Sequence, residues 1–263
     1  MNILIRADSS SYIGTGHIMR DLVLAKQYKN ENIIFATQNL VGNINHKIEE
    51  ENYKIELLKS NGFEELNKLV KKFEIDMIVI DSYDIDYNFE KKLKEDNSSL
   101  KIFVLDDTYE KHFCDILLNH NIYADKKKYQ NRVPKNCELR CGAKYTLLRD
   151  EFLEAKKAKK RVKKKNKTIF LGLGGADHKN LNIKILKVVE KFKKSLKVNL
   201  VTTTANKNLE ELKEYCKDKK WINLQINSNE VAKLMSKSDF AIVTPSVTAN
   251  EIFYLDLPMI TIK

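Results

Sequence analysis

Short, continuous apolar runs that alternate with helical patterns constrain the fold of this chain more than any other feature. In the first half, such runs lie at Asn2–Ala7, Asn32–Thr37, Lys54–Leu58, Met77–Asp81, Lys101–Leu105 and Asp115–Asn119. Helical patterns lie between them around His17–Tyr28, Ile44–Glu51 and Glu64–Phe73. Because both faces of such strands are apolar, the pattern is typical of a parallel sheet covered by helices on both sides. The predicted fold class is therefore α/β.

The same pattern starts again after a lysine-rich stretch. Strands are predicted at Thr168–Leu173, Leu196–Thr203, Trp221–Ile226, Phe240–Thr244 and Met259–Ile262, with helical patterns between them. A length of 263 residues also fits two domains. We therefore predict α/β domains at residues 1–150 and 168–263, joined by a basic linker at 151–167. Ligands bind beyond the carboxyl ends of parallel strands, so a cleft between the domains is the expected site.

The formal net charge of +11 raises the question of nucleic-acid binding. Nine lysines and arginines lie in one run, residues 156–167, which holds no acid, so the rest of the chain has a net charge of +2. A nucleic-acid enzyme is expected to spread basic residues over a folded face with aromatic partners. The run therefore favours a solvated linker or helix end, and no nucleic-acid partner is predicted. Nucleic-acid binding through this run remains an alternative.

The sequence shows no feature of a membrane or exported protein. No stretch approaches about 20 uninterrupted apolar residues, and the N-terminus does not resemble a signal peptide. The four cysteines form no Cys-x-x-Cys pair, which favours free thiols over a zinc site. We therefore expect a cytoplasmic protein without membrane contact, with a monomer as the default.

No motif for a metal ion is evident. Asp84-Ile85-Asp86 has the spacing of an Asp-x-Asp motif, but it lies in a loop before a helix and is interpreted as solvated. The five histidines are not paired four residues apart. Neither a metal nor another cofactor is therefore predicted.

The most informative segment follows the first strand and opens the first helix. Within Arg6–His17, Gly14 and Gly16 allow tight turning and a close approach of a ligand. Met19 stands where a dinucleotide-binding G-x-G-x-x-G motif needs glycine. A helix N-terminus disfavours a protonated imidazole, and a neutral imidazole can accept a proton from water. His17 is therefore a candidate general base; the alternative is that it only caps the helix.

Two turns of the second domain are suited to phosphate groups. Gly172–Asp177 follows the first strand there, where glycines bring backbone N–H groups and a helix N-terminus close to an anion. In Thr244–Glu251, Ser246 is placed to cap the next helix, and the Glu251 carboxylate can accept both ribose hydroxyl protons. A turn without a ligand and a capped helix with a solvent-facing Glu251 remain the structural alternatives.

Acidic residues end two strands of the first domain. Asp81-Ser82-Tyr83 and Asp106-Asp107 would line the same cleft, where they could hold sugar hydroxyls or orient His17. Carboxylates at strand ends also cap turns, so a structural role for Asp81 and Asp107 remains open.

Four motifs taken together are more specific than any one of them. They are Arg6-x-Asp8-x-Ser10, Ile13-Gly14-x-Gly16-His17-x-x-Arg20, Gly174-Gly175-x-Asp177 and Ser246-x-x-x-Asn250-Glu251. With these motifs the chain resembles the UDP-sugar hydrolases of pseudaminic acid biosynthesis. The resemblance runs nearly end to end, through Asp21–Tyr28, Cys114–Asn119 and Arg140–Gly142.

This family hydrolyses UDP-2,4-diacetamido-2,4,6-trideoxy-β-L-altropyranose to the free sugar and UDP, and it is similar to GT-B glycosyltransferases of cell-wall synthesis. The resemblance implies two Rossmann-like domains of GT-B type across a cleft, with the UDP-sugar and UDP as partners. It also implies metal-independent cleavage of the anomeric C–O bond with inversion. The family usually continues beyond the position of Lys263 with a segment ending in a helix, so the second domain is expected to close incompletely in this sequence.

The resemblance assigns roles to individual residues. His17 matches the catalytic histidine. The predicted substrate-binding residues are Asp8, Ser10, Gly14, Gly16, Arg20, Tyr83, Asp107 and Arg149. The predicted nucleotide-binding residues are Gly174, Gly175, Asp177, Ser246, Val247, Asn250 and Glu251. Ala176 stands where threonine is usual, so backbone N–H groups are expected to hold the phosphate there.

Hydrolysis with a single base fits these residues. UDP is a good leaving group, so His17 alone is enough to direct a water molecule at the anomeric carbon. The alternative function is a GT-B UDP-sugar glycosyltransferase, which would have the same fold and nucleotide site. The stereochemistry of the sugar rests on the resemblance alone.

Overall fold

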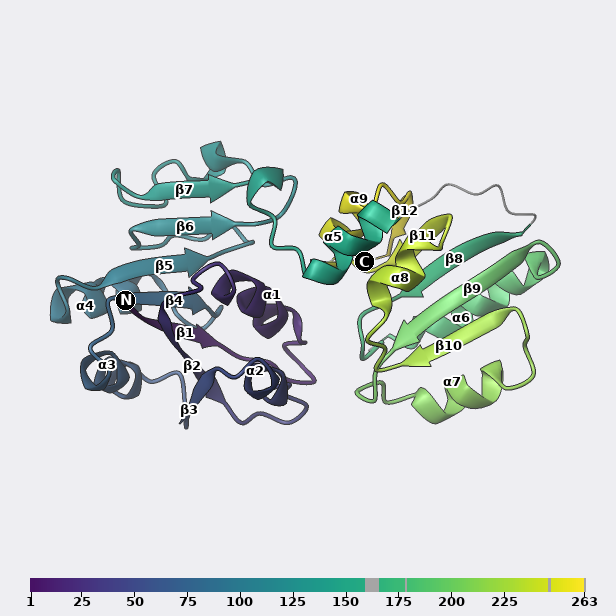
Figure 1. The fold of residues 1–263 in the computed structure, drawn as a ribbon, viewed down its shortest axis with the longest axis horizontal. Helices are drawn as coiled ribbons and strands as arrows, with labels where there is room; N and C mark the ends of the chain where they lie inside the picture. The colour runs from purple at the N-terminus through teal and green to yellow at the C-terminus, as the bar shows by residue number, and fades with distance from the viewer. Residues whose placement is uncertain (159–165, 178, 246, 263) are drawn as a thin grey trace. The chain divides into compact units, whose positions relative to one another are not determined.

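The computed structural model describes residues 1–158, 166–177, 179–245 and 247–262. The chain divides into two compact units, Met1–Leu147 and Leu148–Lys263 (Figure 1). Each unit contains one parallel sheet, which confirms the α/β class, and every strand predicted from the sequence is present. No helix within the described residues is long and apolar enough to cross a membrane.

The first unit has a seven-stranded sheet in the order β3-β2-β1-β4-β5-β6-β7, with all neighbours parallel. Its strands are β1 (Asn2–Ala7), β2 (Asn32–Gln38), β3 (Lys54–Leu58), β4 (Met77–Asp81), β5 (Lys101–Leu105), β6 (Ile116–Asn119) and β7 (Glu138–Cys141). Its α-helices are α1 (Gly16–Ala25), α2 (His46–Glu50), α3 (Phe63–Lys72) and α4 (Tyr87–Asp96).

Alternate residues of each central strand enter different cores. On β1, Ile3 and Ile5 pack with residues of α1 and α2, whereas Leu4 packs with residues of α3 and α4. All three side chains are fully buried. The strand is therefore apolar on both faces, which explains why the sequence shows continuous apolar runs rather than alternation.

The second unit has a five-stranded parallel sheet in the order β10-β9-β8-β11-β12. Its strands are β8 (Lys167–Gly172), β9 (Leu196–Thr202), β10 (Ile222–Ile226), β11 (Phe240–Val243) and β12 (Met259–Thr261). Its α-helices are α5 (Asp150–Ala158), α6 (Leu181–Val189), α7 (Leu209–Cys216), α8 (Val231–Ser236) and α9 (Val247–Tyr254). Helices α6 and α7 share a core on one face, and α5, α8 and α9 share the other.

The start of the predicted linker is folded. Residues 151–158 belong to α5, where Phe152 is fully buried against Phe170 and Met235 of the second core. The prediction of a linker from 151 was wrong there because the lysines hid the apolar side of the helix. Residues 159–165 of the basic run lie outside the described residues.

Strand β7 was also missed by the sequence analysis. It pairs with β6 at the edge of the first sheet, and none of its residues is buried. An edge strand with a half-exposed face does not need a continuous apolar run, so the sequence carried no clear signal.

In each sheet, the strand order reverses beside the strand that comes first in the chain. β1 lies between β2 and β4, and β8 lies between β9 and β11. Ligands bind at such topological switch points, beyond the carboxyl ends of the strands. The segments after β1, β4, β8 and β11 are therefore the ones to examine.

Candidate active site

The turn after β1 brings His17 to the start of α1. Ser10 and Gly14 exchange backbone hydrogen bonds of 3.2 and 2.8 Å, and the Ser10 hydroxyl accepts from the backbone N–H groups of Tyr12 and Ile13. Gly14 has a φ of +87°, a conformation that glycine adopts readily. The loop is therefore closed on itself before it enters the helix, and the Ser10 side chain shapes it.

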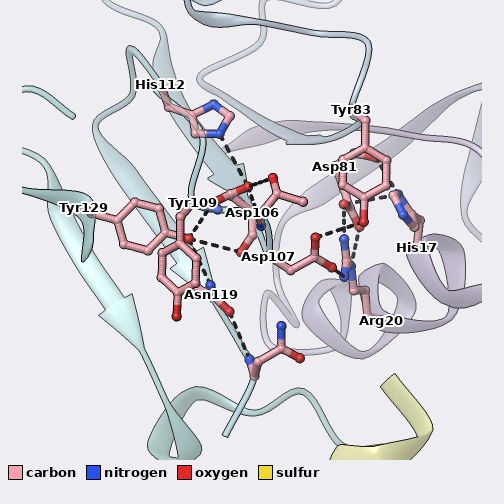
Figure 2. A network of polar contacts seen from close by, with 12 residues as sticks. His17, Arg20, Asp81, Tyr83, Asp106, Asp107, Tyr109, His112, Asn119 and Tyr129 are labelled. Atoms are coloured by element: carbon pink, nitrogen blue, oxygen red, sulfur yellow. Dashed lines mark hydrogen bonds and ion pairs between the residues drawn. The ribbon is translucent and has the colours of Figure 1, made fainter. Parts of the chain in front are cut away.

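The imidazole of His17 is held by one nitrogen. Nδ1 lies 3.0 Å from the backbone oxygen of Asp81 and 3.2 Å from its Oδ1 (Figure 2). A carbonyl oxygen only accepts, so Nδ1 carries the proton and Nε2 carries the lone pair in the neutral ring. Nε2 has no hydrogen-bond partner among the described residues. It is also absent from the fully buried polar atoms that lack a partner, so solvent can reach it. This is the arrangement that a general base needs.

Arg20 fixes the carboxylate beside His17. Its Nε donates to Asp81 Oδ2 at 2.6 Å and its Nη2 donates to Asp81 Oδ1, so the pair is bidentate and buried. Burial alone would raise the pKa of Asp81, but the charge and the hydrogen bonds of Arg20 outweigh burial and lower the pKa. The Asp81 carboxylate is therefore ionised where it faces Nδ1 of His17.

The outer part of the same cluster consists of Asp107 and Tyr83. Arg20 Nη1 lies 3.2 Å from Asp107 Oδ2, and the Tyr83 hydroxyl donates to Asp107 Oδ1 at 2.9 Å (Figure 2). Burial and the nearby Asp107 charge raise the pKa of Tyr83 well above its ordinary value. The Tyr83 ring also meets the His17 ring edge-on, with centroids 5.1 Å apart. The structure thus gathers four predicted residues, His17, Arg20, Tyr83 and Asp107, around Asp81.

The Asp8 carboxylate is engaged by other residues of the first unit. Asp8 is buried, and its carboxylate accepts from the Gln38 backbone N–H at 2.7 Å, from Gln38 Nε2 at 2.9 Å, and from Arg6. These contacts join the ends of β1 and β2. Asp8 therefore supports the loop, while Gly16 begins α1.

Two further histidines near this cluster, His112 and His120, were not predicted as site residues. His120 follows β6, is buried, and has no hydrogen-bond partner on either ring nitrogen among the described residues. Burial and the charge of Arg20 lower the pKa of His120 to about 4, so its ring is neutral. Its place at the end of a predicted strand was the signal that could have found it.

His112 belongs to a second, closed network. Its Nδ1 lies 2.7 Å from Glu90 Oε1, and its Nε2 lies 3.8 Å from Asp106 Oδ1, an ion-pair distance that is too long for a hydrogen bond. Burial disfavours the charged ring, but the Asp106 and Glu90 carboxylates outweigh it and raise the pKa of His112 to about 9. Asp106 also accepts from Thr108, from the Tyr109 backbone N–H and from the Tyr129 hydroxyl. No sequence motif marks these contacts, because they join distant segments.

In the second unit, the glycine turn after β8 is packed against the end of β9. A Cβ atom on Gly175 would lie 2.6 Å from side-chain atoms of Thr203, so only glycine fits there. The Gly175 carbonyl accepts from the Thr203 backbone N–H and from the Thr202 hydroxyl, each at 3.1 Å. Gly174 has a φ of +70°. The conformation of the turn is therefore set by the glycines themselves.

Asp177 ends this turn and caps α6. Its two carboxylate oxygens accept from the backbone N–H groups of Leu181 and Asn182, each at 2.9 Å. The side chain is buried. Asp177 therefore stabilises the start of α6, and both of its carboxylate oxygens accept hydrogen bonds from the helix backbone.

Glu251 of α9 pairs with Arg149. Arg149 Nε and Nη2 donate to Glu251 Oε1 at 3.0 and 2.8 Å, and Arg149 Nη1 lies 2.6 Å from Glu151 Oε1. Burial raises the pKa of Glu251, although Arg149 opposes this. The structure therefore places Arg149 in the second unit, beside a predicted nucleotide-binding residue. Asn250 is also buried on α9, Val247 begins this helix, and Ser246 lies outside the described residues.

Among the described residues, no group of three or more His, Cys, Asp or Glu side chains is arranged to hold a metal ion. Asp86, part of the Asp84-Ile85-Asp86 segment, caps α4 by accepting from the Phe89 backbone N–H at 2.9 Å.

Comparison with known proteins identifies relatives across the whole chain, although no family model matches. The UDP-2,4-diacetamido-2,4,6-trideoxy-β-L-altropyranose hydrolase of Campylobacter jejuni subsp. jejuni serotype O:2 is 39% identical over 255 residues, which covers 97% of this chain and 89% of that protein. The spore coat polysaccharide biosynthesis protein SpsG of Bacillus subtilis is 24% identical over 270 residues, which covers 100% of this chain and 77% of that protein.

Solved structures share the fold. MurG of Acinetobacter baumannii matches with a TM-score of 0.61 at 12% identity, over 99% of this chain and 78% of that chain. UGT89C1 of Arabidopsis thaliana complexed with UDP-L-rhamnose matches with a TM-score of 0.65 at 11% identity, over 99% and 78% of the two chains. These likenesses show two Rossmann-like domains of the GT-B type. The extent of the identity with the Campylobacter enzyme shows that the chain belongs to the family of UDP-sugar hydrolases.

Proposed function

We propose that the chain hydrolyses UDP-2,4-diacetamido-2,4,6-trideoxy-β-L-altropyranose to the free sugar and UDP in pseudaminic acid biosynthesis. The substrate is the one named for the Campylobacter relative. The observation that carries the proposal is the state of His17, whose Nδ1 is fixed by Asp81 while Nε2 has no partner among the described residues. A base held in this way suits attack by water.

The proposed reaction is a single displacement. Nε2 of His17 accepts a proton from water as the water oxygen bonds to the anomeric carbon. The bond between that carbon and the diphosphate oxygen breaks, and UDP leaves with the electron pair. Asp81 stabilises the imidazolium that forms, through the Nδ1 proton. Attack opposite the leaving group inverts the anomeric centre.

We assign the nucleotide half of the substrate to the second unit. The N–H groups of Gly174 and Gly175 and the start of α9 at Val247 are suited to the diphosphate, because helix N-termini and glycine turns favour anions. We assign Ser246, which precedes Val247 in the sequence, to the same group. We assign Asn250 and Glu251 to the nucleoside, with Arg149 holding Glu251. Asp177 contributes by holding α6 in place. No role in this scheme requires a metal ion.

We assign the sugar half to the first unit. Tyr83 is exposed and Asp107 is partly exposed, and both are proposed to contact the sugar, whereas Arg20 is buried and holds Asp81 and Asp107. Gly14 and Gly16 allow the loop to approach the sugar closely. Asp8 and Ser10 are proposed to act by holding that loop.

Hydrolysis without an acceptor tests the proposal. The purified chain, treated with EDTA, is incubated with the UDP-sugar in ¹⁸O-labelled water and followed by NMR and mass spectrometry from time zero. We expect the inverted anomer to appear first, with ¹⁸O in the sugar and none in UDP. Label in UDP would contradict C–O cleavage. No sugar release until an acceptor is added would favour the alternative, a GT-B glycosyltransferase.

A further inference from the structure

Two neighbouring loops of the first unit expose large apolar side chains. Tyr12 and Ile13 lie in the loop between β1 and α1, and Val41 lies in the loop after β2. Tyr12 is 92% exposed, Val41 is 85% exposed, and Ile13 is partly exposed. Because β1 and β2 are adjacent and parallel, both loops lie at the carboxyl edge of the sheet. We call these three side chains the apolar lip.

The lip is held by rigid backbone. Ser11 donates to the Val41 carbonyl through its N–H at 2.9 Å and its hydroxyl at 3.3 Å, and the Ile44 N–H donates to the Ser9 hydroxyl at 2.9 Å. A Cβ atom on Gly42 would lie 2.8 Å from the Ser11 nitrogen, so the loops pack too closely for another residue there. The exposed side chains are therefore presented by a fixed surface.

The composition of these loops differs from that of the chain. Charged residues make up 32% of the sequence, but residues 8–16 and 38–45 contain only one, the buried Asp8. Exposed apolar side chains on a hydrogen-bonded backbone at the ligand-binding edge of a sheet, without flanking charges, indicate a contact surface. The same loop leads directly into α1, which begins with Gly16 and His17.

We propose that the apolar lip binds the acyl methyl groups and the C6 methyl group of the amino sugar, and thereby selects N-acylated deoxy sugars over hydroxylated ones. This rests on the proposed function. The sugar named for the Campylobacter relative carries two acetamido groups and is deoxygenated at C6, so it offers methyl groups where common sugars offer hydroxyls. Burying a methyl group against an aromatic or branched side chain is favourable, whereas burying an unpaired hydroxyl is costly.

The test uses the full chain with Tyr12→Ser, Val41→Ser and the double variant. KM and kcat are measured with the diacetamido-trideoxy substrate and with UDP-N-acetylglucosamine, whose sugar has one acetamido group and a C6 hydroxyl. We expect the double variant to raise KM for the first substrate about tenfold. We expect kcat and the Kd for UDP to change little. UDP-N-acetylglucosamine offers only one of these methyl groups, so its KM should rise less, and the preference for the first substrate should fall.

A matched control separates the lip from exposed apolar residues in general. Leu57 lies on β3, is 61% exposed and is outside both loops. Leu57→Ser should leave KM unchanged. Suppose that the wild-type chain hydrolyses the substrate and that the double variant keeps the wild-type KM and substrate preference. The proposed role of the apolar lip is then overturned, and the proposed function stands. If the wild-type chain releases no sugar, both are overturned.

Discussion

Two buried histidines of the first unit differ in the number of carboxylates beside them. His17 meets Asp81 through Nδ1 only, and its Nε2 has no partner among the described residues. His112 has a carboxylate near each ring nitrogen: Glu90 Oε1 lies 2.7 Å from Nδ1, and Asp106 Oδ1 lies 3.8 Å from Nε2, beyond hydrogen-bond distance. Figure 2 shows His112 beside Asp106. The two rings are equally buried, so burial does not distinguish them.

The difference shows which ring can exchange a proton during a reaction. A histidine between two carboxylates keeps its charge, and the pKa of His112 is accordingly raised to about 9. When one ring nitrogen donates a hydrogen bond, the tautomer and the orientation of the ring are fixed. The other nitrogen keeps a lone pair that can accept a proton. We therefore infer that His112 holds the turn that carries Asp106 and Asp107, while His17 performs the chemistry.

The largest expected effect on stability comes from His112→Leu. This change leaves the buried Glu90 carboxylate without its imidazolium, which we expect to lower the free energy of unfolding by about 3–5 kcal/mol. Turnover per folded molecule should change little. Urea denaturation followed by circular dichroism, together with activity normalised to the folded fraction, checks this. A stable variant with lost turnover would give His112 a direct role in catalysis.

The pH dependence of stability provides the control. The folded-state pKa of His112 is about 9 and its ordinary value is 6.5. Its contribution is therefore complete below pH 6.5 and is lost as the pH rises through about 9. The wild-type free energy of unfolding should decline across that interval, and the decline should be absent in His112→Leu. The same decline in both proteins would assign it to another group.

A smaller effect is expected from two adjacent aspartates that belong to the different networks. Asp106 accepts several hydrogen bonds in the closed network, so Asp106→Asn should cost about 2 kcal/mol. Asp107 is partly exposed and has fewer partners, Arg20 and Tyr83, so Asp107→Asn should cost less than about 1 kcal/mol. Thermal and urea unfolding of the matched pair measures both. Equal costs would mean that the two networks are not distinct.

The sequence predicted the fold and the location of the main cluster because both follow from strand ends. The carboxyl ends of parallel strands meet at one edge, so residues after β1, β4 and β5 had to be neighbours. His17, Asp81 and Asp107 were found in this way, and Arg20 lies one turn from His17 on α1.

Other contacts were not predictable, because they join segments far apart in the chain. Arg149 and Glu251 are 102 residues apart, and nothing in either motif indicates the pair. Asp8 was expected at the substrate, but its partners Arg6 and Gln38 use the carboxylate within the fold. Glu90 lies on a helix whose other acidic residues are exposed, so the neighbouring sequence did not indicate that Glu90 is buried against His112.

The most direct test of the account is the rate of sugar release by His17→Leu, with the affinity for UDP measured on the same preparation. Leucine keeps bulk at the start of α1 but cannot accept a proton. We predict that turnover falls at least about a hundredfold, the range of general-base catalysis, while the Kd for UDP stays close to that of the wild type. Near-normal turnover in this variant would contradict the assignment of His17 as the base.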